Sequence, residues 1–253
     1  MHTSFKASRP GLPLLLAAPG SIGHVASLAV DVIAANSVVE ATRVAASAFV
    51  KPLVCCDAAS LSLKTKLDAA IQIAETKDAV VLLFRSQVFE GHQRKFADEL
   101  VAWIKENQFS SVVLLSSFDA FKRTDAQIQS DSLLRFLSTP APLESPFAQQ
   151  CSSTLNWIQL EQFKRDEEMK DGRQFPIDGG LTDALWSRLV EYSIPTLLVS
   201  MFVPEDGFHF QQAMYLAKSV NQLVNFGKSD EWKIPYSWHD AALTTVTATA
   251  LYT

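Results

Sequence analysis

A short apolar run that ends in a turn and leads straight into a helical pattern is the feature that most constrains the fold. Residues 12–18 read Leu-Pro-Leu-Leu-Leu-Ala-Ala and are followed by Pro19-Gly20. A short apolar run bounded by turn residues predicts a buried strand. From 22 to 33, apolar residues recur three, four and seven positions apart, which predicts a helix ending near Asn36. A buried strand followed by a helix is the building unit of α/β folds.

The alternation of strand and helix patterns continues along the chain. Short apolar runs predict further strands at 44–50, 111–116 and 194–203, and a hairpin formed by 67–74 and 78–85. Helical spacing of apolar residues predicts helices at 93–107, 125–137, 182–192 and 206–226. Strands that alternate with helices predict an α/β fold, with a mostly parallel sheet flanked by helices on both faces.

Length and loop composition predict one domain with an insertion and a tail. A chain of 253 residues, 48% of them apolar, suits a single α/β domain with a large core. Prolines cluster at 138–146 and charged residues at 164–173, so we expect a loop insertion near 138–178. We assign residues 1–240 to the α/β domain and 241–253, which are rich in Ala and Thr, to an extended C-terminal tail.

Charge and hydropathy argue against nucleic-acid and membrane partners. Lys and Arg number 22 against 27 Asp and Glu, a net charge of −5, whereas proteins that bind nucleic acid by bulk charge are basic. No apolar run approaches the roughly 18 residues that a membrane-spanning helix needs. Lys6 and Arg9 give the N-terminus some likeness to a signal peptide, but the apolar run after them is short and contains Pro13. We therefore interpret that run as a strand.

The three cysteines do not make a disulfide framework. Cys55 and Cys56 are adjacent, Cys151 is distant and the total is odd. Proteins with reduced thiols are typical of the cytosol and the nucleus. We expect reduced cysteines and a cytoplasmic or nuclear location.

The sequence contains no strong motif for catalysis, a metal or a cofactor. Gly20-Ser-Ile-Gly23 lies between the first strand and the first helix, where a phosphate can meet a helix N-terminus, but it lacks the G-x-G-x-x-G and phosphate-loop patterns. The five histidines are scattered, and neither a C-x-x-C pair nor a G-x-S-x-G elbow occurs. We predict no catalytic residue, no metal and no cofactor.

One polar segment has two interpretations. Ser116-Ser117 ends a predicted strand, a position at which α/β proteins often bind ligands. The polar residues that follow are Asp119, Lys122, Arg123, Thr124 and Asp125. Their charges either surround a small substrate or belong to a polar loop that docks a partner protein.

Three aromatic residues lie within a short segment near the C-terminus. They are Trp232, Tyr236 and Trp238, and Pro235 interrupts the segment, so a helix is not expected there. One interpretation is a strap that covers the core. The other is an aromatic contact in a protein interface, and we name these three residues as candidate interface residues.

The last residues, Leu251, Tyr252 and Thr253, place an apolar side chain and a tyrosine before a free carboxylate. A carboxylate can be captured by a lysine or by backbone N–H groups, and Tyr supplies rigid apolar area with a hydroxyl. The Ala and Thr residues before them carry no charge and are able to extend into a groove. A frayed terminus is the alternative.

Over most of its length the chain resembles the proteasome assembly chaperone 2 family. The resemblance is carried by a series of segments in the same order. They are Ser21-Ile-Gly-His-Val-Ala-Ser-Leu-Ala-Val-Asp31, Leu100-Val-Ala-Trp-Ile-Lys105, Val112-Val-Leu-Leu-Ser-Ser117, Arg123-Thr-Asp-Ala-Gln127, Leu155-Asn-Trp157, Gly179-Gly-Leu-Thr182 and Trp232-Lys-Ile-Pro235 through Trp238.

The resemblance implies a chaperone and not an enzyme. Members pair with proteasome assembly chaperone 1, and the heterodimer sits on the outer face of the α ring of the proteasome core particle, where it aids assembly and blocks premature association. Some members have a C-terminal hydrophobic-Tyr-any tail that enters pockets between α subunits. Leu251, Tyr252 and Thr253 fit that pattern. The charged segment 164–173 has no counterpart that we can align.

The alternative function is a small-molecule enzyme with a nucleoside-phosphorylase-like architecture. It would use the turn from Gly20 to Gly23 and the loop from Ser116 to Asp125. A third possibility is a scaffold for an unrelated partner. The missing nucleophile, metal and phosphate motifs favour a docking protein over both an enzyme and a cofactor binder.

Overall fold

The computed structural model describes residues 10–56, 67–160, 180–207, 209–226, 232–235 and 238. The helices are α1 (Val25–Asn36), α2 (Gln93–Glu106), α3 (Asp125–Ile128), α4 (Gly180–Glu191) and α5 (Phe210–Leu223). The strands are β1 (Leu14–Ala17), β2 (Val39–Ala45), β3 (Val54–Cys56), β4 (Leu67–Ala69), β5 (Ile71–Thr76), β6 (Val80–Phe84), β7 (Val112–Asp119), β8 (Leu134–Ser138), β9 (Ile158–Gln159) and β10 (Thr196–Val203).

One mixed sheet organises the described residues, in the strand order β2-β5-β6-β1-β7-β10-β8-β9, and β3 and β4 form a separate hairpin. The four central strands β6, β1, β7 and β10 are parallel. Strands β2, β5 and β8 join this centre through antiparallel pairs. The predicted α/β class is confirmed. We call the end at which the four central strands finish the carboxyl edge, and the opposite end the amino edge.

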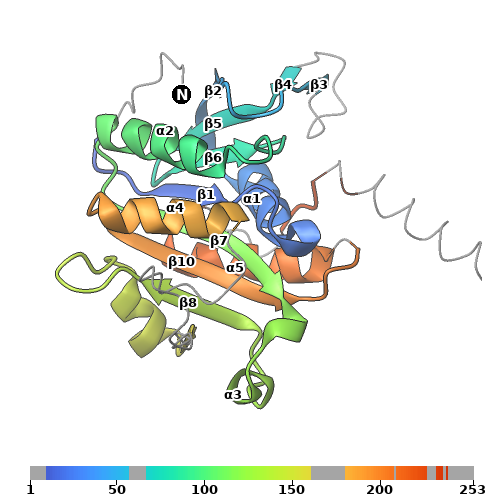
Figure 1. Ribbon diagram of the computed structural model, residues 1–253, viewed down its shortest axis with the longest axis vertical. Coiled ribbons are helices and arrows are strands. Elements are labelled where there is room, and N and C mark those ends of the chain that lie inside the picture. Colours follow the sequence, from blue (N-terminus) through green and yellow to red (C-terminus); the bar gives the residue numbers. More distant parts are fainter. Residues whose placement is uncertain are drawn as a thin grey trace, which may run out of the picture.

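Helices cover both faces of the sheet (Figure 1). α2 packs with α4 on one face, and α1 packs with α5 on the other. Side chains of β1 alternate between the two cores: Leu14 and Leu16 belong to the α2/α4 side, and Leu15 and Ala17 to the α1/α5 side. A strand buried on both faces has to be apolar at every position. The uninterrupted apolar run at 12–18 therefore predicted this central strand.

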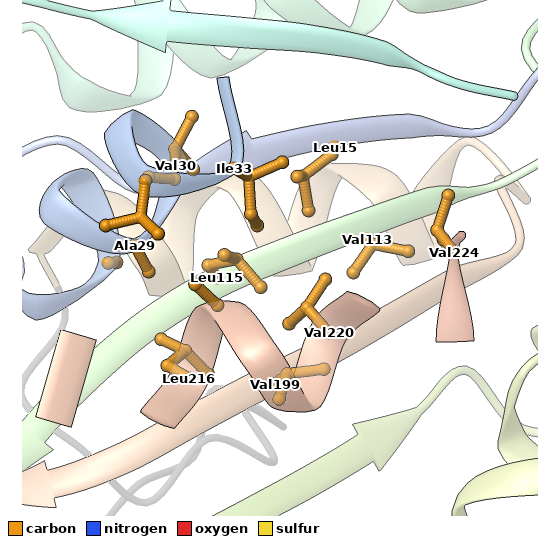
Figure 2. Close-up of a cluster of buried hydrophobic side chains, with 14 of the residues drawn as sticks. Leu15, Ala29, Val30, Ile33, Val113, Leu115, Val199, Leu216, Val220 and Val224 are labelled. Carbon is orange, nitrogen blue, oxygen red and sulfur yellow. The ribbon is translucent and has the colours of Figure 1, made fainter. Parts of the chain in front are cut away.

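The core between the sheet and α1/α5 is drawn in Figure 2. Leu15 and Val113 of the sheet and Leu216 of α5 belong to one buried cluster. Ala29 of α1 and Ala217 of α5 are fully buried. Small side chains at these positions allow the two helices to approach closely. Their interaction is the most extensive between any two helices in the described part of the chain.

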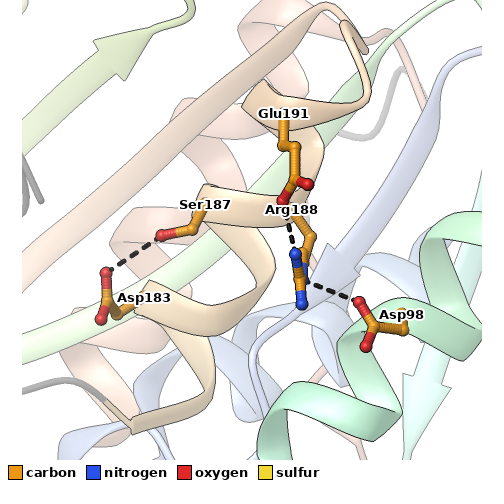
Figure 3. Close-up of polar contacts among 5 residues, drawn as sticks. All are labelled: Asp98, Asp183, Ser187, Arg188 and Glu191. Atoms are coloured by element: carbon orange, nitrogen blue, oxygen red, sulfur yellow. Dashed lines mark hydrogen bonds and ion pairs between the residues drawn. The ribbon is translucent and has the colours of Figure 1, made fainter. Parts of the chain in front are cut away.

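A polar contact joins the two helices on the other face (Figure 3). The guanidinium of Arg188 in α4 pairs with Asp98 of α2 at 2.7 Å and with Glu191 one turn further along α4. The hydrogen bond to Glu191, together with the charge of Asp98, raises the pKa of Arg188 above its ordinary value. These groups are largely exposed, so the contact orients the helices and adds little stability.

The predicted helix at 125–137 is wrong. A helix covers only Asp125–Ile128, and Leu134–Ser138 is strand β8, which pairs antiparallel with β10. The side chains of Ser130 and Ser132 accept backbone N–H groups two residues further on, and such bonds compete with a helix. Leu134 and Leu137 of the strand stand three positions apart, which is also a helical spacing, so spacing alone indicated the wrong period.

The predicted strand at 44–50 is also misplaced. The structure has β2 at Val39–Ala45, at the edge of the sheet, where most of its side chains are exposed. An exposed strand lacks a continuous apolar run. The apolar residues at 44–50 therefore led to a strand being predicted too far along the chain, in the loop after β2. In that loop Val50 forms only an isolated bridge with Val88.

The predicted insertion near 138–178 is only partly described. Its first part contains a π-helical turn at Gln150–Thr154 and the short strand β9 at Ile158–Gln159, so it is not loop throughout. The charged segment 164–173 and the tail 241–253 lie outside the described residues. None of the helices that the structure describes is long and apolar enough to cross a membrane.

Residues 232–235 together with Trp238 form a segment that we call the C-terminal strap. The side-chain amide of Asn36, at the end of α1, donates to the carbonyl of Lys233 at 2.9 Å and accepts from its N–H at 2.7 Å. Trp238 is 5% exposed, and its ring lies 4.9 Å from that of Phe210 at the start of α5. Trp232 packs against the same core. The strap thus crosses the face made by α1 and α5.

Asn36→Ala is expected to loosen the strap. The variant loses two hydrogen bonds to the backbone of Lys233, so we expect unfolding to cost about 1 to 2 kcal/mol less and the amide of Lys233 to exchange faster with deuterium. Urea unfolding and hydrogen exchange followed by mass spectrometry measure both effects. Ser37→Ala is the control, because Ser37 bonds only within the helix end, to Ile33. Equal exchange of Lys233 in the two variants would contradict the bonding described.

Candidate functional site

The carboxyl edge brings together the two segments that the sequence singled out. β1 lies between β6 and β7 in the sheet. Helix α1 follows β1 on one face, and helix α2 connects β6 to β7 on the opposite face. Open α/β sheets bind ligands at such a switch point, outside the carboxyl ends of the strands. The turn after β1 and the loop after β7 therefore meet where a site is expected.

A hollow of about 110 Å³ lies between these two segments. Gly20 and Ser21 line it on one side, and Ser117 and Lys122 on the other. The start of α4 closes it. The volume suits a few water molecules or a small ion and is far below that of a typical ligand pocket.

A second, more open hollow of about 300 Å³ lies on the other side of the turn, beside the end of β6. His24 and Ser27 line it, and so do Asp31 and Arg85, which form an ion pair across it. Phe84 adds an apolar side chain to the lining, which is therefore mixed in character.

Two serine hydroxyl groups near the end of β7 form structural contacts. Ser116 shares a hydrogen bond of 2.8 Å with Thr182 of α4. Ser117 donates to the carbonyl of Ile22, which ties β7 to the turn after β1. The hydrogen bonds of these two serines thus go to a hydroxyl group and to a backbone carbonyl, and not to a general base.

The described residues hold no group of three or more His, Cys, Asp and Glu side chains that could bind a metal ion. Cys151 is fully buried within the α1/α5 core. Burial raises the pKa of its thiol to about 12. The thiol is therefore protonated at neutral pH and is a weak nucleophile.

Gly23 shows why the turn after β1 needs glycine. Its φ is +59°, and a Cβ atom built there would lie 2.4 Å from Cδ2 of His209. The ring of His209 is held in turn by a 3.0 Å contact with the carbonyl of Pro204, just beyond β10. The glycine thus lets the turn after β1 pack closely against the segment that follows β10. The glycine of this turn is therefore explained by packing, without a bound phosphate.

The loop between β7 and β8, residues 120–133, projects beyond the carboxyl edge and carries α3 at its tip (Figure 1). We call it the α3 loop. Phe121 in this loop is 89% exposed and Ile128 is 56% exposed. The charges of this loop were evident in the sequence, whereas Phe121 was not singled out and Ile128 was counted among the apolar positions of the predicted helix at 125–137. The only sequence signal for an exposed contact was a single Phe among polar residues. A single residue has no helical or strand period that would indicate its burial.

The α3 loop is held in a defined conformation despite its exposure. The carboxylate of Asp119 accepts the N–H of Phe121 at 2.9 Å. Thr124 and Gln127 form a reciprocal capping box at the start of α3. At the base of the loop, Arg135 is 1% exposed and donates to backbone carbonyls, including that of Leu134 at 2.8 Å. A rigid support beneath an exposed aromatic ring is typical of a binding contact.

The remaining predicted site residues separate into two groups. Trp238 is part of this chain's own core, and Trp232 is half-buried against it, which supports the interpretation of the segment as a strap. Their use as interface residues stays a prediction. Tyr236 and the tail residues Leu251, Tyr252 and Thr253 lie outside the described residues.

Comparison with known proteins identifies similar chains. A family model described as the PAC2 family matches residues 15–231. A protein named proteasome assembly chaperone 2 from Nematostella vectensis is 32% identical over 171 residues, which cover 65% of this chain and 67% of that protein. The protein of the same name from Bos taurus is 28% identical over 244 residues, which cover 90% of each chain.

The fold is also similar to a solved structure. Pyrococcus furiosus PbaA, described as an archaeal homolog of proteasome-assembly chaperone, superposes with a TM-score of 0.61. The match covers 88% of this chain and 85% of that chain at 11% sequence identity. At this identity the likeness concerns the fold alone.

Gly23→Ala is expected to destabilise the protein more than Gly20→Ala. Both residues have positive φ, but a side chain at position 20 meets open space, whereas at position 23 it meets the ring of His209. We expect about 2 kcal/mol of additional loss in the free energy of unfolding for Gly23→Ala, from the displaced ring. Chemical denaturation of the two variants measures the difference. Equal stabilities would show that the His209 contact does not constrain the turn.

Proposed function

The chain belongs to the PAC2 family, and from this premise we propose that it acts as a proteasome assembly chaperone in the cytoplasm and the nucleus. It forms a heterodimer with a relative of the proteasome assembly chaperone 1 type. The heterodimer docks on the outer face of the α ring of the core particle, promotes ring assembly and blocks premature association. The match of residues 15–231 to the family, with relatives that share one name, carries this proposal.

The character of the carboxyl edge supports docking over catalysis. The alternative of a nucleoside-phosphorylase-like enzyme needs the turn at Gly20 and the loop after Ser116 to form a substrate site. The hollow between them holds about 110 Å³, and the two serines beside it bond to Thr182 and to the backbone of Ile22. A thermal-shift screen with nucleosides and phosphate separates the two functions, because a bound ligand stabilises the folded state.

We further propose that Leu251, Tyr252 and Thr253 insert between adjacent α subunits. Ordering each tail residue costs about 1 to 2 kcal/mol in backbone entropy. Burial of the Tyr and Leu side chains returns about 1.5 to 3 kcal/mol each, and capture of the carboxylate adds to this. These terms nearly cancel, so the tail alone binds weakly. A second contact, from the body or from the partner's tail, has to supply the remaining affinity by avidity.

The proposed function predicts a direct complex. The chain co-expressed with a partner of the proteasome assembly chaperone 1 type is expected to co-purify with it, and the pair to retain purified α subunits in size-exclusion chromatography. Mass spectrometry identifies the subunits in the shifted peak. A pair that forms but leaves all α subunits unbound would contradict the proposed function.

Tyr252→Ala is expected to weaken docking without unfolding the protein. The change removes the largest apolar side chain of the tail, so we expect a loss of about tenfold or more in affinity for the α ring, measured with the partner present. Thr249→Ala, which lies outside the three-residue motif, is the matched control and should bind as the native chain does. An unchanged affinity for Tyr252→Ala would remove the tail from the mechanism.

A further inference from the structure

We propose that the carboxyl edge, with Phe121 of the α3 loop as its principal contact, is the surface of the body that meets the outer face of the α ring. The proposal rests on the proposed function and adds the location of the second contact that avidity requires. The occupant of this surface is an apolar recess on the same ring that receives the tail.

The path of the C-terminal strap indicates which edge faces the ring. α5 starts after β10 at the carboxyl edge and ends at Leu223 near the amino edge. The chain is next fixed at that end of the molecule, where Lys233 bonds to Asn36 at the end of α1. Trp238 then packs on Phe210, the first residue of α5. The strap therefore returns the chain to the carboxyl edge.

Trp238, the last described residue before the tail, lies at this edge. Residues 239–253 follow Trp238 and lead to Leu251, Tyr252 and Thr253. The effective concentration of a tethered group at its receptor is highest when the length of the tether matches the distance to be spanned, and it falls to nearly zero when the tether cannot reach. A tail that follows Trp238 at the carboxyl edge therefore reaches its receptor most readily when that edge faces the receptor.

The α3 loop projects from the same edge. Val203 at the end of β10 lies beside Asp119 at the end of β7, and the loop begins at the next residue. Phe121 is 89% exposed, the largest exposed fraction among the large apolar residues that the structure describes. Ile128 adds a second exposed apolar side chain in the same loop. The root of the tail and an apolar projection thus share one end of the sheet.

The support beneath Phe121 favours a binding role over chance exposure. Its N–H is bonded to Asp119, and Arg123 bonds back to the carbonyl of Ala120 at 3.0 Å, so the turn that carries the ring is closed on both sides. Arg135 secures the base of the loop from within the core. Because the backbone that carries the ring is already fixed, it loses little further entropy on binding.

The affinity of the heterodimer for the purified α ring tests this location. Phe121→Ala is expected to weaken binding about tenfold or more, the range of a buried aromatic contact, while the melting temperature stays unchanged because the ring has few contacts within the chain. Tyr192→Ala is the matched control. Tyr192 is also an exposed aromatic residue, but it follows α4 at the amino edge.

A photo-crosslinking residue provides a second readout. Placed at position 121 it is expected to form a covalent link to an α subunit, and placed at position 192 it is expected to form none. A link from position 121 to the partner chaperone alone would overturn the proposal, because the loop would then belong to the heterodimer interface.

The outcomes separate this inference from the proposed function. The location is overturned, and the proposed function stays intact, if the native chain binds the ring, Phe121→Ala binds it equally tightly and position 121 forms no crosslink. Native chain with its partner that fails to bind the ring overturns both. Weaker binding by Phe121→Ala, normal binding by Tyr192→Ala and a crosslink to an α subunit support the location.

Discussion

The structure depends on the pairing of β1 with parallel strands on both of its sides. Leu14 stands in register with Val80 of β6 and with Val112 of β7, and the strand is buried on both faces. A strand in this position has neither a free edge nor a solvent face, so its neighbours and the covering helices are placed relative to it. The turn after β1, the loop after β7 and the start of α5 all meet at one edge for this reason.

Much of the fold could be predicted from local patterns. The central strands are continuous apolar runs and the long helices have clear periods, so β1, β7, β10, α1 and α2 were found close to their actual bounds. The errors share a physical cause. β2 is exposed at the sheet edge, and β8 contains leucines at helical distances, so in each case tertiary pairing decided what the local pattern left ambiguous.

The surface that we propose as functional was harder to predict than the fold. The sequence identified the polar residues after Ser116 and the turn at Gly20, and the structure brings these segments together. A single Phe among polar residues was too weak a signal to identify Phe121, because exposure is a property of the folded chain. The path of the strap was equally hidden, since it depends on the contact between Asn36 and a residue 197 positions further along the chain.

The strap lies on top of the helices and contributes no strand to the sheet. Its bonds to Asn36 and its ring contact at Phe210 are separate, and neither belongs to the hydrogen-bonded ladder of the strands. If the C-terminus binds as proposed, a pulling force applied through it would therefore separate the strap contact by contact, from Trp238 toward Lys233. The chain between the sheet and the C-terminus would lengthen while the sheet kept its shape. The body would therefore stay folded at the end of an extensible segment.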